Sequence, residues 1–205
     1  MFWVKIPDWI QYLFPQLVWK LPETERTIYF TFDDGPTPGI TPLVLDFLFQ
    51  YNAKATFFCT GWKAEKHPTL INSIRLAGHV IGNHGYNHKS GFCSKTREYS
   101  ADVLKGALVT QSNLFRPPFG RIMPWQIKHL KSKFTIVLWS IMSMDFSSKI
   151  SIEKCYKNVV DNVFPGAIIV FHDTDQASAR LLKVLPQLLS FLQRCGYEFK
   201  ALDNI

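Results

Sequence analysis

The stretch TIYFTFDDGP, residues 27–36, joins a short apolar run to four residues that favour turns. The β-branched and aromatic side chains from Thr27 to Phe32 are typical of a buried strand. Two carboxylates, Asp33 and Asp34, follow where that strand would end. By itself the segment DDGP is most simply a turn, so it indicates a functional site only if partners for the carboxylates occur elsewhere in the chain.

Short apolar runs alternate with amphipathic segments along the rest of the chain. Further strands are predicted over residues 55–59, 80–81, 114–115, 134–141, 167–171 and 198–202. Helices are predicted over residues 41–51, 68–77, 95–108, 124–131, 151–163 and 177–194. This alternation favours a parallel sheet with helices on its outside. About seven such units, without a glycine-rich phosphate loop, favour a barrel over a dinucleotide-binding fold.

The composition indicates one folded domain. The chain has 205 residues, of which 47% are hydrophobic and 19% are charged, so a disordered chain is excluded. No apolar run approaches the roughly 18 residues of a transmembrane helix. The net charge of +7 comes from basic residues spread along the chain, and we expect no nucleic-acid partner. The four cysteines contain no Cys-x-x-Cys pair, which disfavours a structural zinc module.

Residues 1–24 are expected to form an aromatic arm, and residues 25–205 the globular domain. The arm either packs over the core, which we favour, or contacts a membrane surface. The membrane contact would use the side chains of Trp3, Trp9, Leu13 and Phe14. The arm has no basic start and no small-residue cleavage site, so it does not resemble a signal peptide. A cytoplasmic or peripheral membrane location is therefore expected.

Polar residues follow several of the predicted strands. They are His84, His88, Arg116, Asp145 and His172. Because the carboxyl ends of barrel strands meet at one face, we expect these side chains to converge with Asp33 and Asp34. The sequence therefore predicts one polar site at that face.

The types of residue in this set indicate metal-assisted acid–base chemistry. His84 and His88 stand four residues apart, a spacing that on a helical turn puts two imidazoles on one metal ion. Two histidines and a carboxylate are a typical ligand set for catalytic zinc, and also for ferrous iron. The imidazole of His172, with an ordinary pKa of about 6.5, is suited to protonating a leaving amine.

Four motifs, in this order, resemble those of the polysaccharide deacetylase family, the NodB-homology domain of carbohydrate esterase family 4. They are TFDDGP at 31–36, HGYNH at 84–88, RPPFG at 116–120 and IIVFH at 168–172. The resemblance covers nearly the whole chain, from Thr27 to Leu202. It implies an α/β fold of the distorted (β/α)7 barrel type. It also implies hydrolysis of an N-acetyl group on an amino sugar, dependent on one divalent metal ion.

The resemblance also implies roles for single residues. Asp34, His84 and His88 would bind the metal, most often zinc, with cobalt or nickel as alternatives. Asp33 would be the general base and His172 the general acid. Arg116 would orient Asp33, and Asp145 would pair with His172.

The substrate pocket is implied in the same way. The backbone N–H of Phe119 would donate to the oxyanion, and Phe146 and Val170 would line the pocket for the acetyl methyl group.

The chain departs from the family pattern at three places. The second motif usually has Ser or Thr where this chain has Gly85, and the third usually has Tyr in place of Phe119. The fourth motif usually has an additional Asp and an Asp-Trp pair, where this chain has Asp145-Phe146.

The expected substrate is an N-acetylated amino-sugar polymer, such as peptidoglycan, a chitin-like chain or an exopolysaccharide. A second hypothesis is a deacylase acting on an O-acetyl ester, a formylated sugar–lipid or a small cyclic amide. A third is a carbohydrate-binding protein with a structural metal site. The presence of Asp33 and His172 argues against the third, because neither residue is needed merely to hold a metal.

Overall fold

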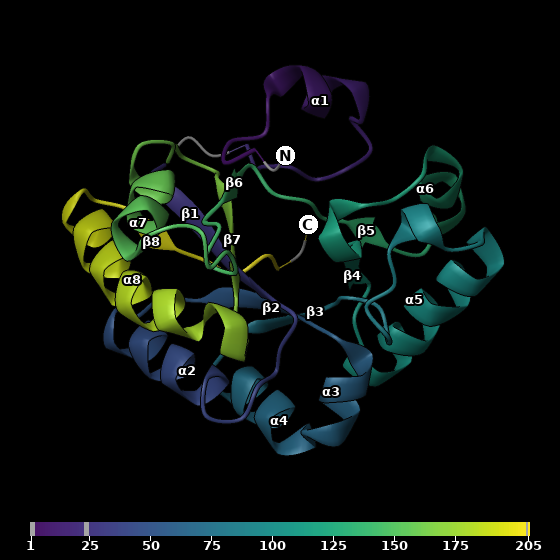
Figure 1. The fold of residues 1–205 in the computed structure, drawn as a ribbon, viewed down its shortest axis with the longest axis horizontal. Helices are drawn as coiled ribbons and strands as arrows, with labels where there is room; N and C mark the ends of the chain where they lie inside the picture. Colours follow the sequence, from purple (N-terminus) through teal and green to yellow (C-terminus); the bar gives the residue numbers. More distant parts are fainter. Residues whose placement is uncertain (1–2, 23–24, 204) are drawn as a thin grey trace.

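One parallel sheet forms the centre of the molecule, and helices lie outside it (Figure 1). The computed structural model describes residues 3–22, 25–203 and 205. Seven strands follow one another in the order β5-β4-β3-β2-β1-β7-β6, and β8 pairs with β1. The strands are β1 (Thr27–Asp33), β2 (Ala55–Cys59), β3 (Val80–Asn83), β4 (Leu114–Phe115), β5 (Thr135–Ile136), β6 (Ile141–Met142), β7 (Ile168–His172) and β8 (Glu198–Phe199).

The helices mostly connect successive strands. They are α1 (Asp8–Leu13), α2 (Thr41–Gln50), α3 (Gly61–Lys66), α4 (Pro68–Leu76), α5 (Thr96–Thr110), α6 (Pro124–Leu130), α7 (Ile152–Val160) and α8 (Asp175–Arg194), with 3₁₀ turns η1 (Gly91–Cys93) and η2 (Pro118–Gly120). Each helix predicted from periodicity is present. Helices α1 and α3 were not predicted, because six residues are too few to show a helical period. None of the described helices is long and apolar enough to span a membrane.

Side chains that alternate along the central strands pack into two separate hydrophobic cores, one on each face of the sheet. On β1, Ile28, Phe30 and Phe32 belong to the core beneath the outer helices. Tyr29 belongs to a second core, inside the curved sheet. Successive side chains of a strand point to opposite faces, so Thr31 and Asp33 share the inner face with Tyr29. The same parity assigns Ile168, Val170 and His172 of β7 to the interior.

The single strand predicted over residues 134–141 is wrong. The run FTIVLWSI divides into β5 and the start of β6, which lie at opposite ends of the strand order. Residues 137–140 cross from one edge of the sheet to the other and close the barrel. An apolar run predicts that its residues are buried, and residues 137–140 are buried. It does not indicate which edge of the sheet each residue pairs with.

The N-terminal arm fills this seam between the two edges. Ile6 N–H donates to the carbonyl of Ser140, and Leu138 N–H donates to the carbonyl of Val18. Ile6 and Leu17 are buried in the inner core, so the arm covers the barrel. Its other face, formed by Trp3, Trp9, Tyr12 and Leu13, is exposed to solvent. Residues 1–2 and 23–24 of the expected arm lie outside the described residues, and the boundary at residue 24 stays a prediction.

Leu17→Ala is expected to lower the free energy of unfolding by about 2–4 kcal/mol, because it leaves a cavity where the arm meets the inner core. Urea denaturation of the purified protein measures this change. Tyr12→Ala is the matched control on the same arm; its side chain is 84% exposed, so a change within about 0.5 kcal/mol is expected. Equal, small effects of both substitutions would show that the arm adds nothing to the stability of the barrel.

Candidate active site

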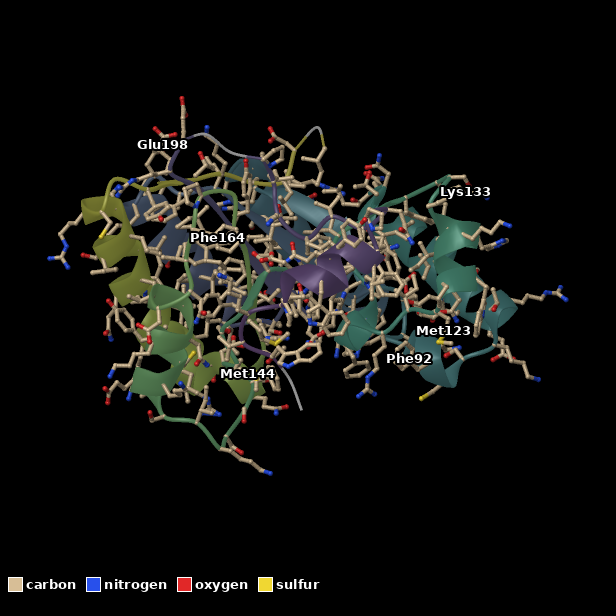
Figure 2. All side chains as sticks on the ribbon, turned by 90° about the horizontal axis from the view of Figure 1, so that it is seen from above. Phe92, Met123, Lys133, Met144, Phe164 and Glu198 are labelled. Atoms are coloured by element: carbon tan, nitrogen blue, oxygen red, sulfur yellow. The ribbon has the colours of Figure 1, made fainter. Side chains whose placement is uncertain are left out.

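The loops that follow the strands gather on one side of the molecule (Figure 2). Met144, just after β6, and Phe92, in the connection after β3, lie on this side. Glu198, which begins β8, and Lys133, just before β5, lie on the opposite side. The carboxyl ends of the strands therefore share one face, where the sequence predicted the site to be.

A cavity of about 280 Å³ opens at this face. In the parallel register of β1 with β7, Asp33 lies opposite His172 and Thr31 lies opposite Val170. Two interior positions on neighbouring strands thus bring a carboxylate and an imidazole to the same cavity. Its lining residues are Asp33, Asp34, His84, His88, Phe119, Trp139, Met142, Phe146, Val170, His172 and Gln176.

Three potential metal ligands converge in the cavity. The candidate ligand atoms of Asp34, His84 and His88 all lie within 4.8 Å of one another. Nε2 of His88 is 2.9 Å from Oδ1 of Asp34, and Nε2 of His84 is 3.3 Å from the same oxygen. The expected helical turn for the two histidines is wrong. They lie in a loop after β3 in which Gly85 (φ 71°) and His88 (φ 55°) are left-handed, and this reversal lets the imidazoles meet without a helix.

The arrangement of these atoms fits a cation. Nδ1 of His84 lies 2.8 Å from the carbonyl oxygen of Arg116, so Nδ1 carries the hydrogen and Nε2 turns its lone pair towards Asp34. Among the described residues, Oδ1 of Asp34 is buried without a well-formed hydrogen bond, although it faces both imidazoles. Burial alone would raise the pKa of the Asp34 carboxyl, but hydrogen bonds and positive charge from protonated His84 and His88 outweigh burial and hold the pKa well below its usual range. A bound cation would take the place of those protons between Asp34 and the two imidazoles. Two imidazoles and an ionised carboxylate suit zinc with an open coordination position.

Asp33 is held by an arginine that has no solvent exposure. Nη1 of Arg116 donates to Oδ1 of Asp33 and to Oγ1 of Thr31, each at 2.7 Å. Its Nη2 and Nε donate to the carbonyls of Leu138 at 2.8 Å and Val137 at 3.3 Å. Burial lowers the pKa of the Arg116 guanidinium, and the ion pair with Asp33 opposes that change. With Oδ1 tied to Arg116, Oδ2 is the Asp33 oxygen left to act in the cavity.

His172 is paired with a second buried carboxylate. Nδ1 of His172 lies 2.8 Å from Oδ1 of Asp145, and the backbone N–H of His172 donates to Oδ2 at 2.7 Å. Nε of Arg180 donates to the Asp145 carbonyl and helps to fix this segment. Burial would lower the pKa of His172, but the charge and hydrogen bond of Asp145 outweigh it and raise the pKa to about 9. Without a bound cation, His172 is therefore protonated at neutral pH, and both Nδ1 and Nε2 carry a hydrogen.

Apart from Gln176, the rest of the cavity wall is apolar. Phe146 and Val170 line it, and the ring of Phe119 meets that of His88 edge-on at 4.5 Å. Phe119 is left-handed at φ 61°, so the backbone itself turns at this point of the wall. All the predicted site residues thus surround or support one cavity, with Arg116 behind Asp33 and Asp145 behind His172.

Three lining residues, Trp139, Met142 and Gln176, were not predicted from the sequence. Trp139 and Met142 belong to an apolar run, in which nothing distinguishes a pocket residue from a core residue. Gln176 stands four residues after His172, in the first turn of the helix that follows β7. Position after a strand was the signal that identified the other site residues, and it was available for Gln176 too.

Comparison with known proteins relates this chain to polysaccharide and peptidoglycan deacetylases. The family model described as polysaccharide deacetylase matches residues 20–132. The chain is 34% identical over 197 residues to a peptidoglycan-N-acetylglucosamine deacetylase of Bacillus cereus, covering 92% of each chain. It is 34% identical over 194 residues to the peptidoglycan-N-acetylmuramic acid deacetylase PdaA of Bacillus subtilis, covering 88% of this chain and 72% of that protein.

A solved structure agrees with the fold. The crystal structure of a peptidoglycan N-acetylglucosamine deacetylase superposes with a TM-score of 0.88 at 32% identity, covering 94% of each chain. This similarity confirms the predicted (β/α)7 class. The chain belongs to the polysaccharide deacetylase family of hydrolases, carbohydrate esterase family 4.

Proposed function

We propose that this protein is a metal-dependent N-deacetylase of peptidoglycan that hydrolyses the acetamide of N-acetylglucosamine residues and releases acetate. The observation that carries the proposal is the single cavity in which Asp33 and His172 flank the ligand cluster of Asp34, His84 and His88. Similarity to the Bacillus cereus enzyme over 92% of both chains favours peptidoglycan over chitin-like chains and exopolysaccharides.

Asp34, His84 and His88 would hold the cation, for which zinc is the simplest choice. When bound, such an ion polarises the acetyl carbonyl and makes a water molecule more acidic. The protein supplies the ligand geometry through the hydrogen bond between His84 Nδ1 and the Arg116 carbonyl, which fixes the tautomer of that imidazole.

Asp33 would act as the general base. Its Oδ1 is fixed by Arg116, so Oδ2 takes the proton of the attacking water. The buried guanidinium, 2.7 Å from Oδ1, prevents the carboxylate from turning away from the cavity.

His172 would act as the general acid. Its Nδ1 is engaged by Asp145, so Nε2 donates a proton to the departing amine nitrogen. The backbone N–H of Phe119 would donate to the oxyanion of the tetrahedral intermediate, a contact of about 3 kcal/mol in comparable sites. Val170 and Phe146 would contact the acetyl methyl group and exclude water from it.

Acetate release from purified peptidoglycan tests the proposal. The reaction products are digested to muropeptides, and mass spectrometry locates the sugar that has lost an acetyl group. Loss from N-acetylglucosamine supports the proposal, and loss from N-acetylmuramic acid overturns its substrate assignment. Release from O-acetylated sugars alone would favour the esterase hypothesis instead.

Asp33→Asn is expected to reduce kcat by about 10²–10⁴-fold, because the amide cannot accept the proton of the water. Metal content should stay at the wild-type value, since the ligand set of Asp34, His84 and His88 is intact. Acetate release and elemental analysis of the same preparation measure both quantities. Turnover at the wild-type rate would show that another group is the base.

His88→Ala is expected to remove both bound metal and turnover, because it leaves only two of the three converging ligands. Dialysis against a chelator, followed by zinc titration, measures the affinity. His67→Ala provides a control, since this histidine lies at the start of α4 and not among the three converging ligands. Stoichiometric zinc in the His88→Ala protein would exclude the proposed ligand set.

Asp145→Asn is expected to move the alkaline limb of the pH profile of kcat/KM to lower pH. A general acid works only while protonated, and the charge and hydrogen bond of Asp145 are the largest of the effects that raise the pKa of His172 to about 9, ahead of the charges of Asp34 and Asp33. Without that charge, the pKa of His172 falls towards its ordinary value, and activity is lost at lower pH. A bound cation lowers the pKa of His172 in both proteins, so the shift between them isolates Asp145. An unchanged alkaline limb would mean that a different group sets it.

A further inference from the structure

The loop of residues 84–88 must keep two imidazoles aimed at one carboxylate oxygen. Two of its residues, Gly85 and His88, have left-handed backbones, and the loop lies outside any helix or strand. Its N–H groups therefore need partners from elsewhere in the fold. His84 N–H donates to the Cys59 carbonyl, and Gly85 N–H donates to Oδ1 of Asn83.

The next two N–H groups of the loop converge on one buried carboxylate, Asp102. Oδ2 of Asp102 accepts from the backbone N–H of Tyr86 at 3.0 Å and from that of Asn87 at 3.1 Å. Oδ1 accepts from the side-chain amide of Asn87 at 2.7 Å. Asp102 lies on α5 and is 6% exposed, so these bonds form away from bulk water and are charge-assisted.

The opposite side of the loop is held by helix α3. The N–H groups of Gly61 and Trp62 donate to the carbonyls of Gly85 and Tyr86, at 2.8 Å and 3.2 Å. The loop is thus fixed between two helices, through its carbonyls on one side and its N–H groups on the other. On the N–H side, the N–H of Asn87 donates to the carboxylate of Asp102. The N–H of Tyr86 donates both to this carboxylate, at 3.0 Å, and to the backbone carbonyl of Asp102, at 3.2 Å.

Gly85 and Asp102 also compete for the same space. A Cβ atom added at Gly85 would lie 3.0 Å from Oδ2 of Asp102. A hydroxyl-bearing side chain at position 85 and the carboxylate of Asp102 in its present place are therefore difficult to accommodate together. The absence of a side chain at position 85 leaves room for the carboxylate to reach the loop.

We propose that Asp102 is a positioning residue of the metal centre: it fixes the loop so that His84 and His88 meet Asp34. In this chain, Asp102 supplies the anchor that a serine or threonine hydroxyl at position 85 would otherwise give. The inference rests on the proposed function, because it assumes that the cluster of Asp34, His84 and His88 binds a cation.

Asp102→Ala and Asp102→Asn test the proposal through cobalt binding to the full chain. Asp102→Ala is expected to weaken Co²⁺ affinity by roughly 10–100-fold and to shift the ligand-field absorption bands, since the histidines lose their fixed orientation. Asp102→Asn should lie between it and the wild type, because the amide keeps one acceptor oxygen. Glu98→Gln, an exposed position on the same helix, is the control and should keep the wild-type affinity and bands.

A double-mutant cycle with Gly85→Ser separates positioning from general stability. The strain of a left-handed serine is common to both backgrounds and cancels in the cycle. In the presence of Asp102, serine crowds the carboxylate and should weaken Co²⁺ binding. In the Asp102→Ala background, its hydroxyl has space to accept from the freed N–H groups and should restore part of the affinity. The two substitutions are therefore expected to be non-additive.

The outcomes distinguish this inference from the proposed function. Thermal melting of the metal-free proteins first identifies the folded variants, and Asp102→Asn provides the test if Asp102→Ala does not fold. Wild-type affinity and bands in a folded Asp102 variant, or strict additivity with Gly85→Ser, would overturn the role of Asp102 while leaving the metal site in place. A wild-type protein that binds no Co²⁺ or Zn²⁺ would overturn both.

Discussion

The buried guanidinium of Arg116 connects the parts of the site. It binds Asp33 and Thr31 of β1, and it also binds the carbonyls of Val137 and Leu138 in the segment that closes the barrel. A cation without solvent exposure is tolerated only when its charge and its N–H groups are matched. Removing Asp33 or Arg116 would leave the other charge buried alone, at a cost of about 3–5 kcal/mol. The hydrogen bonds of this one side chain thus hold Asp33, the proposed general base, together with Val137 and Leu138, which lie between the two edges of the sheet.

The backbone of the same residue serves the metal cluster. The Arg116 carbonyl is the acceptor for Nδ1 of His84, which turns Nε2 of that imidazole towards Asp34. The proposed base, Asp33, and the proposed metal ligand His84 are therefore positioned by one residue after β4, through its side chain and its carbonyl. The proposed acid, His172, is positioned separately, by Asp145 in the loop after β6.

Much of this arrangement follows from patterns that the sequence makes visible. The run Thr27 to Phe32 predicts β1, and it places Asp33 and Asp34 where that strand ends. The motif residues follow strands, and in a parallel barrel such positions share a face. The sequence alone therefore groups Asp34 with His84 and His88, because residue type and position after a predicted strand are both local properties.

What only the tertiary structure decided are the pairings between distant segments. The run from Phe134 to Ile141 is apolar throughout, and nothing in it indicates that it leaves one edge of the sheet and joins the other. The loop of His84 and His88 turns through left-handed residues. The N–H groups of its Tyr86 and Asn87 are satisfied by Asp102, which comes 14 residues after His88 and lies on helix α5. The sequence by itself determined which polar residues gather at one face of the sheet, because they follow its strands. Their orientation was decided by hydrogen bonds to buried partners, and such partners are set by packing in three dimensions, which periodicity along one chain does not encode.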